Sequence, residues 1–149
     1  MRVQDRLLLV VVTGAALASV DLIVKATVPT AWWAFHHRSN GWVALSVVLL
    51  IGALVLAFLP SRAVALAGGV MVGGVLGNLV SARADGGWVP NPLTIGGYGG
   101  GIAFNLADVF FVLGEVLLMT TLMVQVVRNR DRLAPARAWE RAVQRRLHP

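Results

Sequence analysis

Four polar residues near the middle of the chain could support acid–base or hydrogen-bonding chemistry within an otherwise apolar sequence. Asn105 and Asp108 lie three residues apart in FNLADVFF, and Asn78 ends the stretch GGVLGN. Asn91 lies between these two segments, in GGWVPNP. A carboxylate inside an apolar run is costly and usually functional. An aspartic hydrolase needs two carboxyl groups that share one proton, and Asp108 supplies half of such a pair.

The chain around these residues is strongly apolar. Hydrophobic residues make up 57% of its 149 residues and charged residues 13%, whereas a soluble domain has about 25% charged residues. The hydrophobic residues are concentrated in four runs. Each run is near the ~20 residues that a helix needs to cross a bilayer, and each has almost no polar face. These runs are residues 7–28, 42–59, 63–80 and 103–127. We therefore predict an all-α membrane protein that forms one domain, residues 1–149. It contains four transmembrane helices, and the last of them is followed by a basic tail, residues 128–149.

The positive charges predict the orientation of these helices. Ten arginines lie in the N-terminal tail, the turn PSR and the C-terminal tail, whereas Arg38 and Arg83 alone lie in the other two loops. Since Lys and Arg gather on the cytoplasmic side, both termini are predicted to be cytoplasmic. The first run is too long for a cleavable signal peptide and lacks a small-residue cleavage site. The basic tail is interpreted as a topology determinant that touches anionic lipid, rather than as a nucleic-acid-binding segment. Two alternatives remain for its structure: it either forms a short interfacial helix around Trp139 or does not.

Neither a cofactor nor a metal ion is expected. The chain has no cysteine, which excludes disulfides and thiolate metal sites. His36 and His37 are adjacent, but two neighbouring histidines are more typical of a solvated loop than of a metal site.

Glycine and proline dominate the predicted outer segment between the third and fourth runs. Residues 81–102 contain seven glycines and two prolines, so we expect neither a helix nor a regular strand there. Trp88 and Tyr98 could anchor this loop at the membrane surface. The loop is either a flexible connector or a flap over a groove. Within the third run, Gly69, Gly73 and Gly77 lie on one helix face and predict a packing seam.

Other ionisable residues also lie inside the runs. Asp21 and Lys25 are one helical turn apart, so we expect an ion pair in a supporting role, with the Lys25 side chain extending outward. Glu115 lies seven residues after Asp108, about two turns or ~10 Å deeper, which is too far to share a proton. We expect Glu115 to find a partner on another helix or to stay protonated. Asn78, Asn105 and Asp108 would then form the polar rim of an apolar groove.

At these residues the chain resembles the lipoprotein signal peptidase family, signal peptidase II, and the resemblance extends over all four runs. DLIVK is similar to the Asp-x-x-x-Lys motif of the family's first span, and RSNG looks like its asparagine–glycine segment. GGVLGNLV is similar to the end of its third span, and FNLADVFF to its fourth. The positions so matched are Asp21, Lys25, Asn40, Asn78, Asn105 and Asp108, of which Asp108 corresponds to the family's second catalytic aspartate.

The resemblance implies a function at a bacterial cytoplasmic membrane. Members of the family are membrane aspartic peptidases that remove signal peptides from diacylglyceryl-modified prolipoproteins. The implied partners are therefore a lipidated prolipoprotein or another signal-peptide-like helix, together with membrane lipids.

The chain also departs from the family pattern. Asn91 stands where the family has its first catalytic aspartate, and an amide cannot act as a general base, although it can donate a hydrogen bond. Spontaneous deamidation is disfavoured because Pro92 lacks the backbone N–H that this route needs. In LVSAR, Arg83 lies one place beyond the arginine of the family's Asp-Arg pair. Asp85 is the other carboxylate on the predicted outer side, and it could partner Asp108 if the loop folded back.

Two functional classes remain open from the sequence. In the first, the protein binds a lipidated or signal-peptide-like helix in an intramembrane groove with weak or no peptidase activity. In the second, it is a divergent aspartic-type endopeptidase that uses Asp108 with Asp85 or another partner. We favour the first class, because a lone aspartate lacks the acid–base pair.

Overall fold

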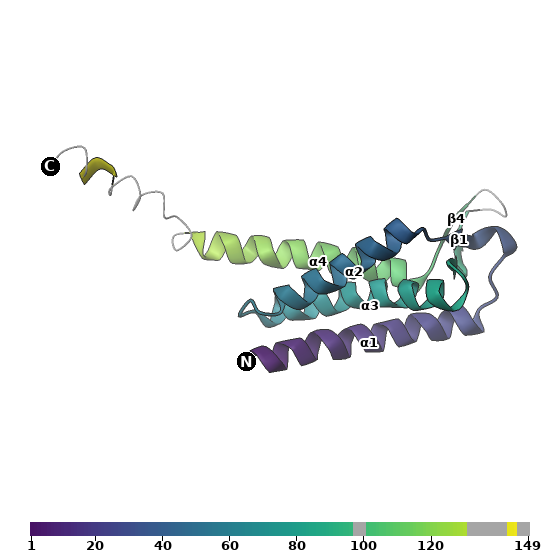
Figure 1. Ribbon diagram of the computed structural model, residues 1–149, viewed down its shortest axis with the longest axis horizontal. Coiled ribbons are helices and arrows are strands. Elements are labelled where there is room, and N and C mark those ends of the chain that lie inside the picture. The colour runs from purple at the N-terminus through teal and green to yellow at the C-terminus, as the bar shows by residue number, and fades with distance from the viewer. Residues whose placement is uncertain (97–100, 131–142, 146–149) are drawn as a thin grey trace.

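The computed structural model describes residues 1–96, 101–130 and 143–145. Four long helices make up most of this part of the chain. They are α1 (Val3–Thr27), α2 (Asn40–Leu56), α3 (Arg62–Ala84) and α4 (Leu106–Arg128). The shorter elements are the 3-10 helix η1 (Trp32–Ala34) and the strands β1 (Phe35–His37), β2 (Trp88–Pro90), β3 (Leu93–Ile95) and β4 (Ile102–Phe104). All the short elements lie at one end of the helices, which we call the ribbon end, and the N-terminus lies at the opposite end (Figure 1).

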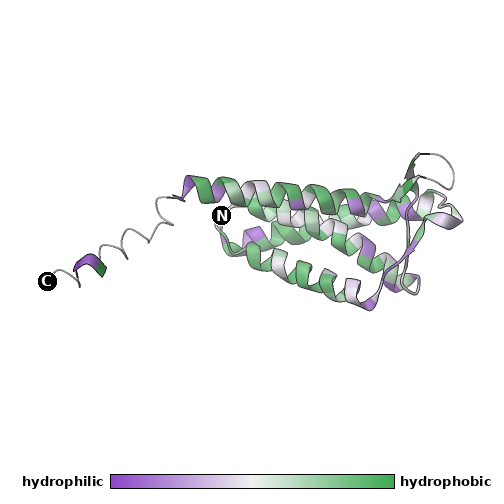
Figure 2. Ribbon diagram, turned by 90° about the horizontal axis from the view of Figure 1, so that it is seen from above, coloured by the Kyte–Doolittle hydropathy of each residue, from purple (hydrophilic) through white to green (hydrophobic). Residues whose placement is uncertain are grey.

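Three of the helices, α1, α3 and α4, are long and apolar enough to cross a membrane. The fourth, α2, is also apolar but has 17 residues and is shorter than the predicted run 42–59. It ends early because residues 57–59 tighten into turn-type hydrogen bonds ahead of Pro60. Apolar residues cover much of the helix surfaces, and polar residues concentrate toward their ends (Figure 2). The prediction of a mostly helical protein with helices long and apolar enough to span a membrane is confirmed for these three helices.

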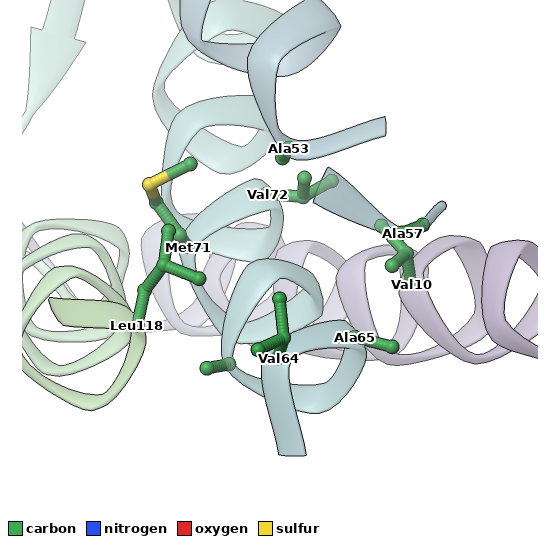
Figure 3. Close-up of a cluster of buried hydrophobic side chains, with 9 residues drawn as sticks. Val10, Ala53, Ala57, Val64, Ala65, Met71, Val72 and Leu118 are labelled. Carbon is green, nitrogen blue, oxygen red and sulfur yellow. The ribbon is translucent and has the colours of Figure 1, made fainter. Parts of the chain in front are cut away.

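Helix α3 is the centre of the bundle and packs against each of the other three helices. Its contact with α1 depends on the predicted glycine seam. A Cβ atom at Gly69 would lie 2.8 Å from Cβ of Thr13, and one at Gly73 would lie 2.7 Å from Cβ of Leu17. Real side chains do not approach so closely, so glycine lets the two helices meet. Side chains from all four helices complete the core, including Val10, Ala53, Met71, Val72 and Leu118 (Figure 3).

The buried side chain of Arg6 holds the end of α2 beside the start of α1. Its Nε donates to the carbonyl oxygen of Ala57 at 2.9 Å, and its Nη2 to that of Phe58 at 3.2 Å. These carbonyl groups lie at the C-terminal end of α2, where they have no intrahelical donor and where a cation is favourable. The turn between α2 and α3 is therefore fixed from the side of α1.

Two short antiparallel ribbons occupy the ribbon end. In the first, β1 pairs with β2, with Phe35 opposite Pro90 and His37 opposite Trp88. In the second, β3 pairs with β4, with Leu93 opposite Phe104. The prediction that residues 81–102 would form neither helix nor strand is thus wrong. The strands are only three residues long, and β2 pairs with the distant strand β1, so local composition did not indicate them.

Two glycines of this segment make the turn that follows α3. Gly86 and Gly87 have φ angles of 59° and 97°, in the left-handed region that favours glycine, and they lead from α3 into β2. Helix α3 itself continues to Ala84, beyond the predicted end at residue 80. Tyr98, and the greater part of the tail for which an interfacial helix was considered, lie outside the described residues.

Candidate functional site

A reciprocal cap at the start of α4 fixes Asn105 and Asp108. Oδ1 of Asn105 accepts a hydrogen bond from the backbone N–H of Asp108 at 2.9 Å. In return, Oδ2 of Asp108 accepts from the backbone N–H of Asn105 at 3.2 Å. Such a capping box satisfies two backbone donors that would otherwise lack partners, and it places the carboxylate at the positive end of the helix dipole. The spacing of three residues noted in the sequence therefore has a structural cause as well.

Asn78 of α3 joins this cap to α1. Its Nδ2 donates to Oδ1 of Asp108 at 2.8 Å. Its Oδ1 accepts from Nζ of Lys25 at 2.8 Å and from Nδ2 of Asn105 at 2.9 Å. The structure thus brings together the three residues that were predicted to share a polar rim, and it adds Lys25 to them.

Asp21 and Lys25 form a buried ion pair at 2.7 Å, with side chains 0% and 4% exposed. Oδ1 of Asp21 also accepts from the backbone N–H of Ala107 at 2.8 Å, so α1 holds the first turn of α4. A Cβ atom at Gly77 would lie 2.6 Å from the Asp21 carboxylate, and glycine is required there. The predicted ion pair is confirmed. The prediction that Lys25 extends outward is wrong, because its ammonium group turns inward to the acceptor of Asn78.

Asn91 is fully buried and connects the first ribbon to the cap of α4. Its Oδ1 accepts from Nδ2 of Asn105 at 2.5 Å, and its Nδ2 lies 2.8 Å from Nδ1 of His36. Its backbone N–H donates to the carbonyl oxygen of Ala34 at 3.0 Å. Asn91 does not hydrogen-bond to Asp108, since Asn105 lies between them.

The direction of every hydrogen bond in this cluster is fixed by its charged members. Oδ1 of Asn78 faces the Lys25 ammonium, so its Nδ2 must face the Asp108 carboxylate. Nδ2 of Asn105 then donates to both neighbouring asparagines, which leaves Nδ2 of Asn91 as the donor to His36. Nδ1 of His36 is then the acceptor of this hydrogen bond. This role of His36 could not be predicted from the sequence, because its partner is 55 residues away.

A cavity of about 240 Å³ lies beside Asp108, where α2 and α4 each pack on α3. Asp108, Asn78 and Arg38 form its polar end. The apolar lining comes from all three helices and includes Trp42, Leu45, Leu49, Val75 and Phe111. The Asp108 side chain is 33% exposed, so its carboxylate is open to this space. The arrangement supplies one accessible carboxylate above an apolar wall.

Arg38 is the nearest cation to that carboxylate and was considered in the sequence for its bearing on topology alone. Its Nη2 lies 3.6 Å from Oδ1 of Asp108. The guanidinium carbon lies 5.0 Å from the centre of the Trp42 ring, within cation–π range. The backbone N–H of Arg38 donates to the carbonyl oxygen of Gly87 at 2.7 Å, which ties it to the turn before β2.

Four polar residues discussed in the sequence analysis do not belong to this cluster. Asn40 is the first residue of α2 and is exposed, and Arg83 and Asp85 are exposed at the end of α3. Glu115 is exposed on α4, and of the two alternatives expected for it, a partner on another helix is not found among the described residues. Within residues 1–96, 101–130 and 143–145, no hydrogen bond or ion pair links any of these four side chains to Asp108. No group of metal-binding side chains occurs in those ranges either.

Comparison of the chain with known proteins does not name a family. No family profile matches the sequence, and no characterised protein is significantly similar to it.

Proposed function

We propose that the protein is a signal peptidase II-like membrane protein that binds a lipidated or signal-peptide-like helix and has weak or no peptidase activity. The observation that carries this proposal is the burial and hydrogen bonding of the Asn91 side chain. This residue stands at the position of the missing catalytic aspartate, it is fully buried, and its side-chain amide is engaged on both sides by Asn105 and His36. Asp108 therefore has no second carboxyl group as a partner among the described residues.

The chemistry expected of such a site is binding rather than hydrolysis. An aspartic mechanism requires one carboxylate as base toward water and a second carboxyl group as acid toward the scissile carbonyl. The side chains nearest to Asp108 are the amide of Asn78 and the guanidinium of Arg38. Both groups donate hydrogen bonds or attract the carboxylate, and neither serves as the proton-sharing partner.

The apolar lining of the cavity supports a membrane-embedded ligand. A volume of about 240 Å³ accommodates a few side chains or part of an acyl chain, not a complete helix. A ligand helix would therefore lie along the gap between α2 and α4 and place one face in the cavity. Trp42 and Phe111 on opposite sides of the gap would contact that face.

The proposal includes four membrane spans in the bacterial cytoplasmic membrane, with α2 as the second span and both termini cytoplasmic. The excess of arginine on the side of the termini supports this orientation. A reporter fused after residue 149 should be cytoplasmic, and one inserted near residue 97 should be outside. The reverse pattern would place the polar cluster at the cytoplasmic face and contradict the proposal.

Photocrosslinking tests the ligand directly. A photoreactive residue at Leu45, which lines the cavity and is 56% exposed, should label a diacylglyceryl-modified signal peptide added to the protein in detergent. Val20 on α1 is a matched control, because it is 45% exposed but is not part of the cavity. Equal labelling at both positions, or none at Leu45, would argue against a groove between α2 and α4.

A further inference from the structure

The guanidinium group of Arg38 has more hydrogen-bond donors than acceptors around it. Its side chain is 22% exposed, and it carries five N–H donors. Among the described residues it makes no hydrogen bond, and its Nε is buried without an acceptor. The nearest anion is Oδ1 of Asp108 at 3.6 Å, beyond the length of a good hydrogen bond. Donors withdrawn from water without an acceptor are unfavourable, so an acceptor from outside the chain is expected here.

Asp108 has unused capacity on the same cavity. Each of its oxygens accepts one hydrogen bond, from Asn78 and from the backbone of Asn105 respectively. A carboxylate offers about four acceptor positions, so about two remain. The polar end of the cavity therefore presents a cation and an anion side by side, each incompletely satisfied.

We propose that this cavity binds the headgroup of an ethanolamine phospholipid. The phosphate oxygens would accept from Arg38, because a guanidinium group pairs with phosphate through parallel N–H···O bonds. The ammonium group of ethanolamine would donate to Asp108. The apolar lining from Trp42, Leu49 and Phe111 would contact the lipid below its headgroup.

The charge pattern distinguishes this lipid from others in the membrane. Phosphatidylglycerol would bring a phosphate to Arg38 but no cation to Asp108, which lies 3.6 Å from that guanidinium. Phosphatidylcholine carries a positive charge but has no N–H to donate to the carboxylate. The proposal uses the groove described above, but it holds whether or not a peptide binds there.

Lipid retention measured by native mass spectrometry tests the proposal. The full chain in detergent would be incubated with equimolar phosphatidylethanolamine, phosphatidylglycerol and phosphatidylcholine that carry identical acyl chains. We expect one ethanolamine lipid per chain, retained at least about fivefold more than either competitor. Arg38→Gln should lower its affinity by about tenfold, as expected when a charge-assisted hydrogen bond is lost. Asp108→Asn should abolish the preference for ethanolamine over glycerol.

Arg83→Gln is the matched control, because it removes an exposed arginine at the ribbon end that does not line the cavity. Retention by this variant should equal that of the natural chain. Equal loss in Arg83→Gln and Arg38→Gln, preference for the glycerol lipid, or no retained phospholipid would each overturn the proposal.

Two further measurements serve as controls, one for the folding of the variants and one for binding of the free headgroup. Helix content by circular dichroism shows whether each variant is folded. If Arg38→Gln unfolds, the lipid preference of the natural chain alone tests whether the cavity binds an ethanolamine phospholipid. Free phosphoethanolamine should displace the lipid only at much higher concentration, and displacement at equal concentration would refute a lipid ligand. Because crosslinking to the peptide is a separate assay, failure of the lipid proposal is distinguishable from failure of the proposed function.

Discussion

Asn91 and Asp108 are connected through one residue, Asn105, which donates its side-chain amide to the first and its backbone N–H to the second. Position 91, to which the proposed function assigns a lost catalytic carboxylate, is therefore next to the cap of α4 but has no hydrogen bond to Asp108. This relationship determines what an aspartate at position 91 can do.

We predict that Asn91→Asp gains slow cleavage of a lipidated signal peptide, whereas the natural chain and Asp108→Asn cleave little or none. The new carboxylate would accept from Asn105 as Oδ1 of Asn91 does now. Two carboxyl groups at close range cannot both ionise cheaply, so they would share a proton once the Asn105 side chain moves aside. A gel-shift assay with purified protein in detergent measures the product.

Robust cleavage by the natural chain that disappears in Asp108→Asn would instead identify a divergent peptidase. Absence of cleavage in all three proteins would mean that Asn105, Pro90 and Pro92 keep position 91 away from Asp108.

Replacement of Asn105 should destabilise the protein because this side chain both caps α4 and links two other asparagines. Asn105→Ala removes the cap, worth about 1 kcal/mol, and leaves Oδ1 of the buried Asn91 without its donor, at about 1–3 kcal/mol, whereas Oδ1 of Asn78 keeps its hydrogen bond from Lys25. We expect a total loss of roughly 2–4 kcal/mol in the free energy of unfolding. Unfolding followed by tryptophan fluorescence in detergent measures it.

Asn40→Ala provides the comparison for this variant, because Asn40 is exposed and lies outside the cluster. Similar losses for the two variants would show that Asn105 does not link the cluster.

The Asp21–Lys25 pair should show strong coupling. Asp21→Asn and Lys25→Met each leave one buried charge without its partner, and each should lower the free energy of unfolding by about 3–5 kcal/mol. The double variant removes both charges and should lose clearly less than the sum of the single variants. The exposed pair of Arg2 and Asp5, with side chains 83% and 43% exposed, is the control and should show little coupling. Additive losses at Asp21 and Lys25 would contradict the ion pair.

Gly77→Ala should destabilise the protein. The added Cβ would lie 2.6 Å from the Asp21 carboxylate and 3.1 Å from the Ala107 side chain, so α1, α3 and α4 would have to separate. Overpacking of this kind costs about 1–3 kcal/mol. At Gly52 on α2 nothing lies within 4 Å of an added Cβ, so Gly52→Ala should be neutral or stabilising. Thermal unfolding of the two variants in the same detergent compares them, and a stable Gly77→Ala would disprove the close contact.

The helices and part of the polar cluster were predictable because their signals are local. Apolar run length indicated the helices, and spacings of three and four residues paired Asn105 with Asp108 and Asp21 with Lys25. The roles of His36 and Arg38 were not predictable in the same way. His36 meets Asn91 across 55 residues, through a ribbon whose strands are three residues long. Pairing at such distances leaves no periodic signal in the chain.

The buried ion pair of α1 has a consequence for the order in which the protein is made. Asp21 and Lys25 are one turn apart on the first helix, so they can neutralise each other before any other helix has been synthesised. Asn78 reaches Lys25 only with the third helix, and the backbone of Ala107 reaches Asp21 only with the fourth. The two charges thus enter the nascent bundle as a neutral unit. Helix α4, the last of the four long helices to leave the ribosome, then closes the polar cluster around them.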